Sequence, residues 1–322
     1  MISNSSLKDI GRMLMEAETI LLFPHTSPDG DAIGSCAALC RALREAGKTA
    51  WILLDEPVTG YLAFMDTEFC TEDKDIIGKP DVCVCIDCSE ESRFPDRAAK
   101  YREGRIKLCL DHHVTSGSFG DYYYVDGDEA ATAQIVYRLL VEMGLEIGKT
   151  TAESLYIGIS TDTGSFRHSN TTAESHLIAA QLFKKGIDHT RIIVNLYNSV
   201  SYKRVRMESE ILSRMELLAE GKAAISCVTE EMLAAENATL EDCEGVVDAL
   251  RDIRGVELAA FLKEKSGAVK VSLRAKSYGN VDEIAVKFGG GGHVKAAGCT
   301  LDMSMDEAME VMKKELCDYW ER

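Results

Sequence analysis

The sequence predicts an α/β protein with a mostly parallel sheet that has helices on both faces, followed by a smaller α/β domain. Apolar runs at 19–24, 50–54, 82–86 and 106–110 have the length and composition of buried strands. Helical patterns separate these runs, such as GSCAALCRALREAG at 34–47. Strands that alternate with helices favour parallel pairing, and such sheets bind their ligands at the carboxyl ends of the strands.

Length and composition limit the class of protein. The chain has 322 residues, of which 46% are hydrophobic, so it can bury a sizeable core and form two domains of ordinary size. No apolar run approaches the ~18 residues of a membrane span, and the N-terminal segment lacks a basic stretch that leads into a long apolar one. We therefore expect a cytoplasmic protein that does not bind membranes.

The net charge of −17 argues against broad binding to long nucleic acid, because a phosphate backbone is held by dense Lys and Arg surfaces. A short anionic substrate is compatible with this charge, since metal ions can neutralise phosphate locally.

The chain has eleven cysteines, and several lie inside apolar runs such as VCVCIDC at 82–88. A reduced cysteine in such a run acts as a small hydrophobic side chain. Cys85 and Cys88 could instead form a redox or metal pair, but the sequence has no second cysteine pair at zinc-finger spacing. The cysteines therefore predict core packing and no disulfide framework.

The loop after the first predicted strand, FPHTSPDGDAIGS at 23–35, places His25, Asp29 and Asp31 within seven positions. Taken singly, His25 could bond to the backbone, and the two aspartates could be turn and helix N-cap residues. Crowded carboxylates repel one another unless something positive lies between them. The loop therefore indicates a bound cation.

Two other strands deliver the same residue types to the same edge of the sheet. Asp87 ends VCVCID, and Asp111, His112 and His113 end KLCLDHH. Solvated charge placed by chance would rarely converge in this way.

Asp162 adds a further carboxylate, after helical patterns at 131–144 and 152–160. An isolated Asp-Thr-Gly is more simply a turn or a helix cap. The predicted metal ligands are His25, Asp29, Asp31, Asp87, His112 and Asp162. This mixed oxygen and imidazole set is too large for one tetrahedral zinc and suits two divalent ions.

Carboxylate and imidazole ligands together favour manganese, although ligand type leaves magnesium, cobalt and iron open. Two ions about 3.5–4 Å apart activate a water and stabilise the attacking and leaving oxygens of a phosphoryl group. The expected reaction is hydrolysis of a phosphoester.

The domain boundaries follow from composition. We expect a catalytic domain over 1–187, a charged helical connector over 188–220 and a second domain over 221–322. The second domain contains AVKVSLRAK at 268–276, which has the period of a strand, and ends in an amphipathic helix at 305–319.

Period two places Lys270, Ser272, Arg274 and Lys276 on one face of that strand. This basic face could recognise phosphate, or its lysines could be solvated. The segment FGGGGHVKAAGC at 288–299 has apolar flanks that a flexible linker would lack. Its glycines predict a close approach in which backbone N–H groups can reach a phosphate.

Together these motifs resemble the DHH phosphoesterase superfamily. The resemblance rests on HTSPDGD, the strand-final Asp87, DHH at 111–113, DTG at 162–164 and GGGGH followed after three residues by AAG. It covers most of the chain, and the last motif resembles the second domain of the nanoRNase and pAp phosphatase branch. That domain argues against a pyrophosphatase, and the length argues against the larger RecJ-type exonucleases.

The resemblance implies a role for each residue. His25, Asp29 and Asp87 would hold one manganese ion, and Asp31, Asp87, His112 and Asp162 the other, so that Asp87 bridges the two. His113 would contact the scissile phosphate. Arg274, His293 and the backbone of Gly290, Gly291 and Gly292 would bind the rest of the nucleotide. The active site would then lie in a cleft between the two domains.

The function expected from the sequence is cleavage of short RNA oligonucleotides to 5′-mononucleotides, together with removal of the 3′-phosphate of pAp. One alternative is hydrolysis of linear or cyclic dinucleotide second messengers. Another is a nucleotide-sensing module without turnover, which would be marked by loss of a metal ligand, and none is lost here. A homodimer, the physiological metal and the preferred oligonucleotide length stay open.

Overall fold

The computed structural model describes residues 2–65, 67–113 and 119–320. The chain divides into two compact units, Met1–Ser199 and Val200–Arg322. Among the described residues, no helix combines the length and the apolar character needed to cross a lipid bilayer.

The segment predicted as a connector, 188–220, is shared between the two units. Helix α7 (His189–Tyr197) belongs to the first unit and α8 (Tyr202–Ser213) to the second. The predicted helical character ends there, because Glu216–Leu218 form strand β8 at the edge of the second sheet.

The first unit is built on a sheet of seven strands in the order β1-β7-β6-β5-β2-β3-β4. The strands are β1 (Ile2–Ser3), β2 (Thr19–Phe23), β3 (Thr49–Leu53), β4 (Cys70–Thr71), β5 (Val82–Ile86), β6 (Ile106–Asp111) and β7 (Tyr122–Val125). Every neighbouring pair is parallel except β1 with β7. This confirms the predicted α/β class, and the four predicted strands are β2, β3, β5 and β6.

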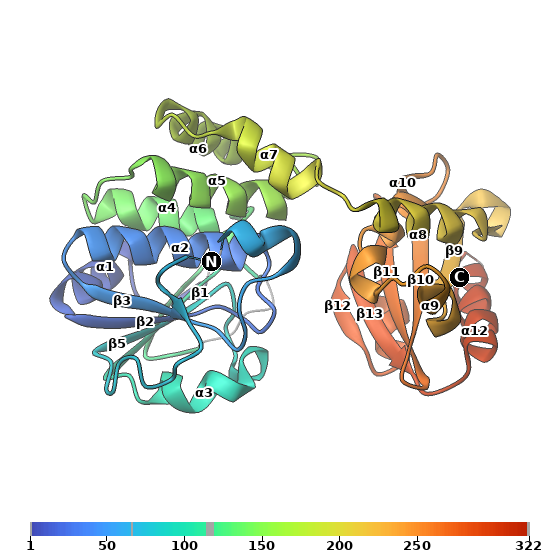
Figure 1. Cartoon of the computed structure of the whole chain (residues 1–322), viewed down its shortest axis with the longest axis horizontal. Coiled ribbons are helices and arrows are strands. Elements are labelled where there is room, and N and C mark those ends of the chain that lie inside the picture. The colour runs from blue at the N-terminus through green and yellow to red at the C-terminus, as the bar shows by residue number, and fades with distance from the viewer. Residues whose placement is uncertain (1, 66, 114–118, 321–322) are drawn as a thin grey trace. The chain divides into compact units, whose positions relative to one another are not determined.

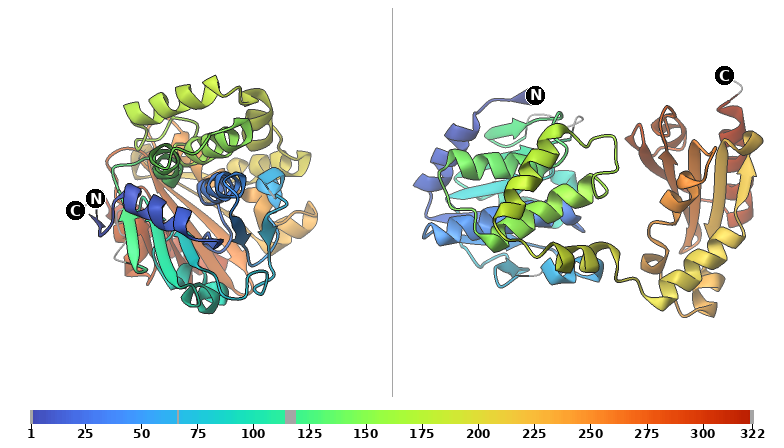
Figure 2. Two further views of the ribbon diagram at one scale, coloured as in Figure 1. Left: turned by 90° about the vertical axis from the view of Figure 1, so that its left-hand side faces the viewer. Right: turned by 90° about the horizontal axis from the view of Figure 1, so that it is seen from above.

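Helices cover both faces of this sheet (Figures 1 and 2). They are α1 (Leu7–Glu16), α2 (Gly30–Glu45), α3 (Pro95–Arg102), α4 (Thr132–Glu142), α5 (Lys149–Asp162) and α6 (Ala173–Lys184). Helices α2 and α4 contact the sheet on one face, α5 packs on α2, and α6 and α7 form an outer layer on α5. Helix α3 contacts β2 and β5 on the opposite face.

The central strands β2 and β5 are almost entirely apolar because both of their faces are buried. In β2, Ile20 and Leu22 join the core under α2, whereas Leu21 and Phe23 join the core under α3. Helix α2 begins four residues before the predicted start, because the Asp29 side chain caps it by accepting hydrogen bonds from the backbone N–H groups of Asp31 and Ala32.

The second unit is a six-stranded mixed sheet in the order β12-β13-β11-β10-β9-β8, with only β9 and β10 parallel. Its strands after β8 are β9 (Ala223–Val228), β10 (Leu258–Lys265), β11 (Ala268–Ala275), β12 (Gly291–His293) and β13 (Ala296–Leu301). Its helices after α8 are α9 (Glu230–Ala235), α10 (Val246–Asp252), α11 (Asp282–Lys287) and α12 (Met305–Asp318). The predicted smaller α/β domain is thereby confirmed.

The two faces of the second sheet differ. Val269, Val271 and Leu273 of β11 point into the core covered by α11 and α12. On the opposite face of the sheet, α8 and α10 cover β9 and β10. The polar side chains of β11 project from this same face.

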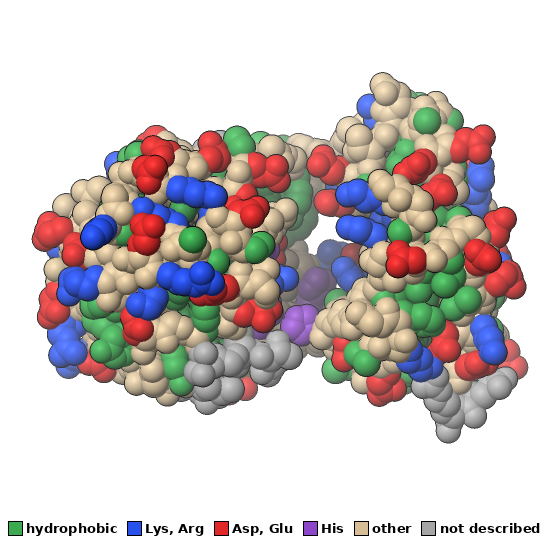
Figure 3. Space-filling view, turned by 90° about the horizontal axis from the view of Figure 1, so that it is seen from below, with side chains coloured by type: hydrophobic (Ala, Val, Ile, Leu, Met, Phe, Trp, Pro, Cys, Tyr) green, Lys and Arg blue, Asp and Glu red, His purple; other side chains and the backbone are tan. Residues whose placement is uncertain are grey.

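Charge is mixed over the face of the molecule shown in Figure 3. Lys and Arg side chains are interspersed with Asp and Glu on the first unit in this view. A face of mixed charge lacks the dense basic surface that long nucleic acid needs.

Candidate active site

The carboxyl ends of three neighbouring parallel strands form the candidate site. Strand β5 lies between β2 and β6, so His25 after β2, Asp87 after β5 and His112 after β6 meet at one edge. The loop after β2 leads into α2, which brings Asp29 and Asp31 to the same edge. This is where a parallel sheet is expected to carry its ligands.

The structure brings all six predicted metal ligands together in two groups. One group is His25, Asp29 and Asp87, and the other is Asp31, His112 and Asp162. A third group, Asp87, His112 and His113, shares one residue with each of these two. Within each group, one ligand atom from each residue lies within 4.8 Å of the others. Asp162 reaches the site as the last residue of α5.

Asp87 faces both groups. Its Oδ2 lies 3.9 Å from Nε2 of His25, and its Oδ1 lies 3.7 Å from Nε2 of His112. Asp87 is 2% exposed and has a φ of +60°. Asp tolerates this left-handed conformation better than most residues, and such backbone strain is typical of functional sites.

Backbone carbonyls orient the two histidines. Nδ1 of His25 lies 2.9 Å from the carbonyl oxygen of Thr26, and Nδ1 of His112 lies 3.1 Å from that of Glu129. A carbonyl can only accept, so Nδ1 carries the proton in each ring. In the neutral imidazole, Nε2 then has a lone pair to offer a metal, which is the usual arrangement of metal-binding histidines.

Asp31, in the first turn of α2, is fully buried and lies against the N-terminus of α4. Its carboxylate accepts hydrogen bonds from the backbone N–H groups of Thr132 at 2.6 Å and Ala133 at 2.9 Å, and from the Ser35 hydroxyl at 3.2 Å. The Thr132 hydroxyl in turn donates to Oδ1 of Asp87 at 2.8 Å. The start of one helix thus positions two of the predicted ligands.

The electrostatics of the site favour a cation. Burial raises the pKa of Asp31, and burial with the neighbouring Asp31 and Asp29 carboxylates raises that of Asp87 well above its usual range. Burial and Asp31 raise the pKa of Asp162 to about 7. Positive charge between these groups would relieve both the desolvation and the mutual repulsion.

His113 differs from His112 in its orientation. Its Nδ1 lies 2.7 Å from Oδ1 of Asp111, which also accepts hydrogen bonds from the backbone N–H groups of His112 and His113. Burial alone would lower the pKa of His113, but the Asp111 carboxylate raises it overall. The ring is therefore held ready to donate a proton or a hydrogen bond.

A second network holds the loop that carries His25. The Arg97 guanidinium is buried and donates to the carbonyl oxygens of Pro24 at 3.0 Å and Leu53 at 2.7 Å. It also pairs with both carboxylate oxygens of Asp55 at 2.8 and 2.9 Å. Asp55 accepts a further hydrogen bond from the Thr26 hydroxyl at 2.9 Å.

The sequence does not indicate several supporting residues. Thr132 and Arg97 have no motif around them, and Asp111 is visible only as the first letter of DHH. Asn170, whose side-chain amide donates to the carboxylate and the backbone carbonyl of Asp162, also lacks a signal. Support of this kind depends on contacts between distant segments, which spacing along the chain cannot reveal.

The cysteine pair lies beside the site but is not part of it. Cys85 and Cys88 are free and buried, with their sulfur atoms 3.0 Å apart, and burial raises the pKa of Cys85 well above its usual range. Thiols of raised pKa are poor nucleophiles and poor ligands. No cysteine belongs to the metal-binding groups found among the described residues.

In the second unit, the predicted nucleotide-binding residues share one face of the sheet. Arg274 on β11 and His293 on β12 both pair with Ala296 on β13, so the three residues form one row across the strands. The Arg274 guanidinium donates to the Leu273 carbonyl at 3.0 Å and lies 3.5 Å from the Asp248 carboxylate.

The glycines in and just before β12 lie close to the backbone of β13. A Cβ at Gly290 would lie 2.1 Å from the carbonyl oxygen of Gly298, and one at Gly292 would lie 2.5 Å from that of Ala296. A Cβ at Gly291 would meet nothing closer than 3.8 Å. Gly290 and Gly292 thus allow β12 to pack on the sheet, while Gly291 leaves its backbone accessible.

Two family models match the chain. The model for the N-terminal domain of the DHH family matches residues 19–159, and the DHHA1 domain model matches residues 220–321. A curated relative, the bifunctional oligoribonuclease and PAP phosphatase NrnA of Thermus thermophilus, is 34% identical over 92% of this chain and 90% of its own length.

Solved structures agree with this fold. An exopolyphosphatase-related protein from Bacteroides fragilis superposes with a TM-score of 0.92 at 28% identity, over 99% of this chain and 97% of its own. RecJ from Thermus thermophilus, solved in complex with Mn²⁺, gives a TM-score of 0.57 at 14% identity over 98% of this chain and 54% of its own, which shows a shared fold alone.

Proposed function

Because the chain belongs to the DHH/DHHA1 phosphoesterase family, we propose that it is a metal-dependent enzyme that degrades short oligoribonucleotides to 5′-mononucleotides and removes the 3′-phosphate of pAp. The similarity to an oligoribonuclease and PAP phosphatase over nearly the full length of both chains supports this choice of substrates.

The position of Asp87 carries the proposal. Its two carboxylate oxygens face two separate groups of ligands, each with imidazole nitrogen and carboxylate oxygen. We propose that His25, Asp29 and Asp87 hold one divalent ion and that Asp31, Asp87, His112 and Asp162 hold a second. Donors of this kind fit manganese. When bound, such a pair lowers the pKa of water and stabilises negative charge on phosphoryl oxygens.

The chain's own residues orient the substrate. His113, held by Asp111 through Nδ1, presents Nε2 as a donor to a non-bridging oxygen of the scissile phosphate. A preorganised donor of this kind stabilises charge that develops in the transition state. In the second unit, Arg274 and His293 would bind the non-reacting part of the nucleotide, with the accessible backbone of Gly291 beside them.

The test is a substrate panel with purified protein and Mn²⁺. The panel contains the 5′-phosphorylated dinucleotide pApA, a pentanucleotide, a 24-mer, pAp, linear and cyclic diadenylate, and pyrophosphate. We expect mononucleotides from pApA and the pentanucleotide, AMP from pAp, and much slower cleavage of the 24-mer. The matched control is Asp302→Asn, which changes an exposed aspartate of the second unit and should leave every rate unchanged.

Preferred turnover of the 24-mer or of pyrophosphate would contradict the proposal. Faster hydrolysis of cyclic diadenylate than of pApA would replace it with the second-messenger alternative. Substrate binding without turnover of any member would replace it with a nucleotide-sensing function.

A further inference from the structure

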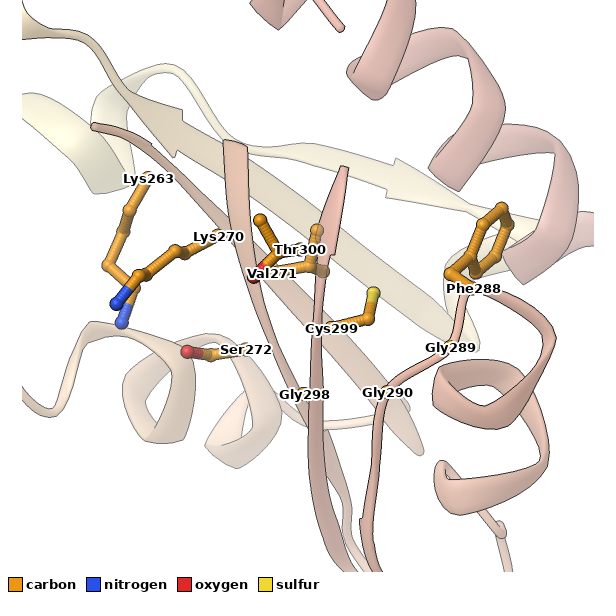
Figure 4. Close-up of a pocket in the computed structure, with 10 residues that line it drawn as sticks. All are labelled: Lys263, Lys270, Val271, Ser272, Phe288, Gly289, Gly290, Gly298, Cys299 and Thr300. Carbon is orange, nitrogen blue, oxygen red and sulfur yellow. The ribbon is translucent and has the colours of Figure 1, made fainter. Parts of the chain in front are cut away.

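A pocket of about 400 Å³ lies on the polar face of the second sheet, beside the row of Arg274 and His293. Figure 4 shows it between β11, β13 and the glycine segment that precedes β12. Its polar lining comes from Lys263, Lys270, Ser272 and Thr300. The proposed function uses none of these four side chains.

Strand pairing explains why these side chains converge. Lys263 on β10 lies directly opposite Lys270 on β11, and Lys270 lies opposite Thr300 on β13. Directly paired residues project from the same face with Cβ atoms about 4.5–5.5 Å apart. In Figure 4 the two lysine side chains extend toward the same point, with Ser272 on the same side.

Two lysines directly opposite each other repel, which destabilises the sheet at this position. Among the residues that the structure describes, no carboxylate forms an ion pair with either ammonium group, and Nζ of Lys263 lies 5.9 Å from the centre of the Phe261 ring. Burial and the positive charges of Arg274 and Lys270 lower the pKa of Lys263, and Glu244 offsets only part of this. An anion between the two ammonium groups would remove the repulsion.

The rest of the lining suits a phosphate. Hydroxyl groups of Ser272 and Thr300 can donate to phosphate oxygens, and Gly289, where a Cβ would meet nothing within 4 Å, leaves room for a close approach of the ligand to the backbone. Val271, Phe288 and Cys299 supply an apolar part of the wall, but the charged side chains of the lining are both lysines, so the ligand is an anion.

The spacing of side chains along β11 indicates that the pocket binds a phosphate of the nucleic acid backbone. Arg274, Ser272 and Lys270 occur at every second residue, so adjacent members are about 6.7 Å apart along the strand. Successive phosphates of an extended nucleic acid strand repeat over a comparable distance. Ser272, which lines the pocket, lies one such repeat from Arg274, and Lys270 lies two repeats away. A strand bound through one phosphate at Arg274 can therefore bring its next phosphate to Ser272, inside the pocket.

We propose that the Lys263–Lys270 pocket binds a backbone phosphate of an oligonucleotide, beyond the phosphate held at Arg274. This rests on the proposed function and assigns the pocket to substrates longer than a dinucleotide. The 5′-phosphorylated dinucleotide and pAp each have two phosphates, one at the scissile position and one for Arg274. The trinucleotide pApApA is the first substrate with a third.

The kinetic test compares the wild type, Lys263→Gln/Lys270→Gln and a control, Lys185→Gln/Lys314→Gln. The control removes the same charge from exposed lysines that lie outside the pocket. We expect the pocket variant to lose about tenfold in kcat/KM on pApApA and less than about twofold on pApA and pAp. For pApApA, the dependence of log KM on log salt should fall by about 0.7, because the variant neutralises one phosphate fewer.

Binding to metal-free protein separates the pocket from catalysis. Fluorescently labelled pApApA should bind about tenfold more weakly to the pocket variant than to the wild type or the control. Equal losses on all three substrates, an unchanged salt dependence, or unchanged trinucleotide binding would overturn the inference. Weaker binding of inorganic phosphate without weaker binding of pApApA would also overturn it, because the pocket would then be a site for free anions.

A failure of the proposed function gives a different result. In that case the wild type cleaves neither pApA nor pApApA, while the metal-free binding experiment still reports on the pocket. Lys270→Gln alone changes only an exposed side chain and therefore keeps the test valid if the double variant does not fold.

Discussion

Gly158 of α5 lies directly against Asp31 of α2. A Cβ at Gly158 would lie 2.8 Å from Oδ1 of Asp31 and 2.7 Å from Cβ of Ala133. Both distances are shorter than real Cβ contacts, so the absence of a side chain at Gly158 allows the Asp31 carboxylate to lie between α5 and the start of α4.

Gly158→Ala should therefore displace Asp31 and weaken metal binding. We expect Mn²⁺ affinity to fall by about tenfold or more, as for loss of a group that orients a metal ligand, with kcat on pApA falling in parallel. The measurement is a Mn²⁺ titration of the variant. Gly148→Ala at the N-cap of the same helix is the control, since a Cβ there meets nothing within 4 Å. Unchanged affinity in Gly158→Ala would show that the site tolerates the added methyl group.

The Asp55–Arg97 pair should contribute stability that depends on pH. Burial alone would raise the pKa of Asp55, but the Arg97 guanidinium and the Thr26 hydroxyl lower it overall. A lowered acid pKa gives stability that is present above the usual value near 3.8 and is lost as the pH falls through the lowered value.

Asp55→Asn leaves a buried guanidinium without its charge partner, so we expect a loss of about 3 kcal/mol at pH 7. The difference from the wild type should begin to shrink as the pH falls below 3.8, and it should disappear only below the lowered pKa of Asp55. Urea unfolding at pH 7 and in steps below pH 3.8 measures this change, with Asp302→Asn as an exposed control. An equal destabilisation at every pH would mean that the pair acts through shape rather than charge.

Arg274→Ala should separate recognition from chemistry. A charge-assisted contact contributes about 1.5–3 kcal/mol, so kcat/KM on pApA and pAp should fall by roughly one to two orders of magnitude. The loss should be small on an activated aryl phosphoester, which offers nothing beyond the scissile group. Bound manganese should not change.

Arg251→Ala is the matched control for Arg274→Ala, because Arg251 also pairs with the Asp248 carboxylate but lies on α10 outside the row. Equal losses of Arg274→Ala on nucleotides and on the aryl ester, or loss of manganese, would place Arg274 in the catalytic centre or in folding.

Most of the candidate metal site could be located from the sequence because its residues follow the ends of strands. The buried runs before His25, Asp87 and His112 mark β2, β5 and β6, and parallel pairing brings their carboxyl ends together. Asp162 was less evident, since it ends a helix rather than a strand.

The remaining fold was harder to predict for physical reasons. Strands β1 and β4 have two residues each, too few to show a period, and β7 is a run of three tyrosines with one valine. The pairing of Lys263 with Lys270 depends on the β10–β11 register, which the spacing of the lysines alone does not fix. Gly290 and Gly292 allow β12 to pack closely on β13, and this contact between strands cannot be read from the glycine run itself.

The bridging position of Asp87 is the central claim, and the magnetic coupling of bound Mn²⁺ tests it most directly. We predict that the wild type binds two ions about 3.5–4 Å apart, with an exchange-coupled electron paramagnetic resonance spectrum. Asp87→Ala should lose the coupled spectrum together with nearly all activity on pApA, because its carboxylate faces both groups of ligands. A fully active wild type with a single uncoupled ion, or an Asp87→Ala variant that keeps the coupled spectrum and near-normal turnover, would contradict the account.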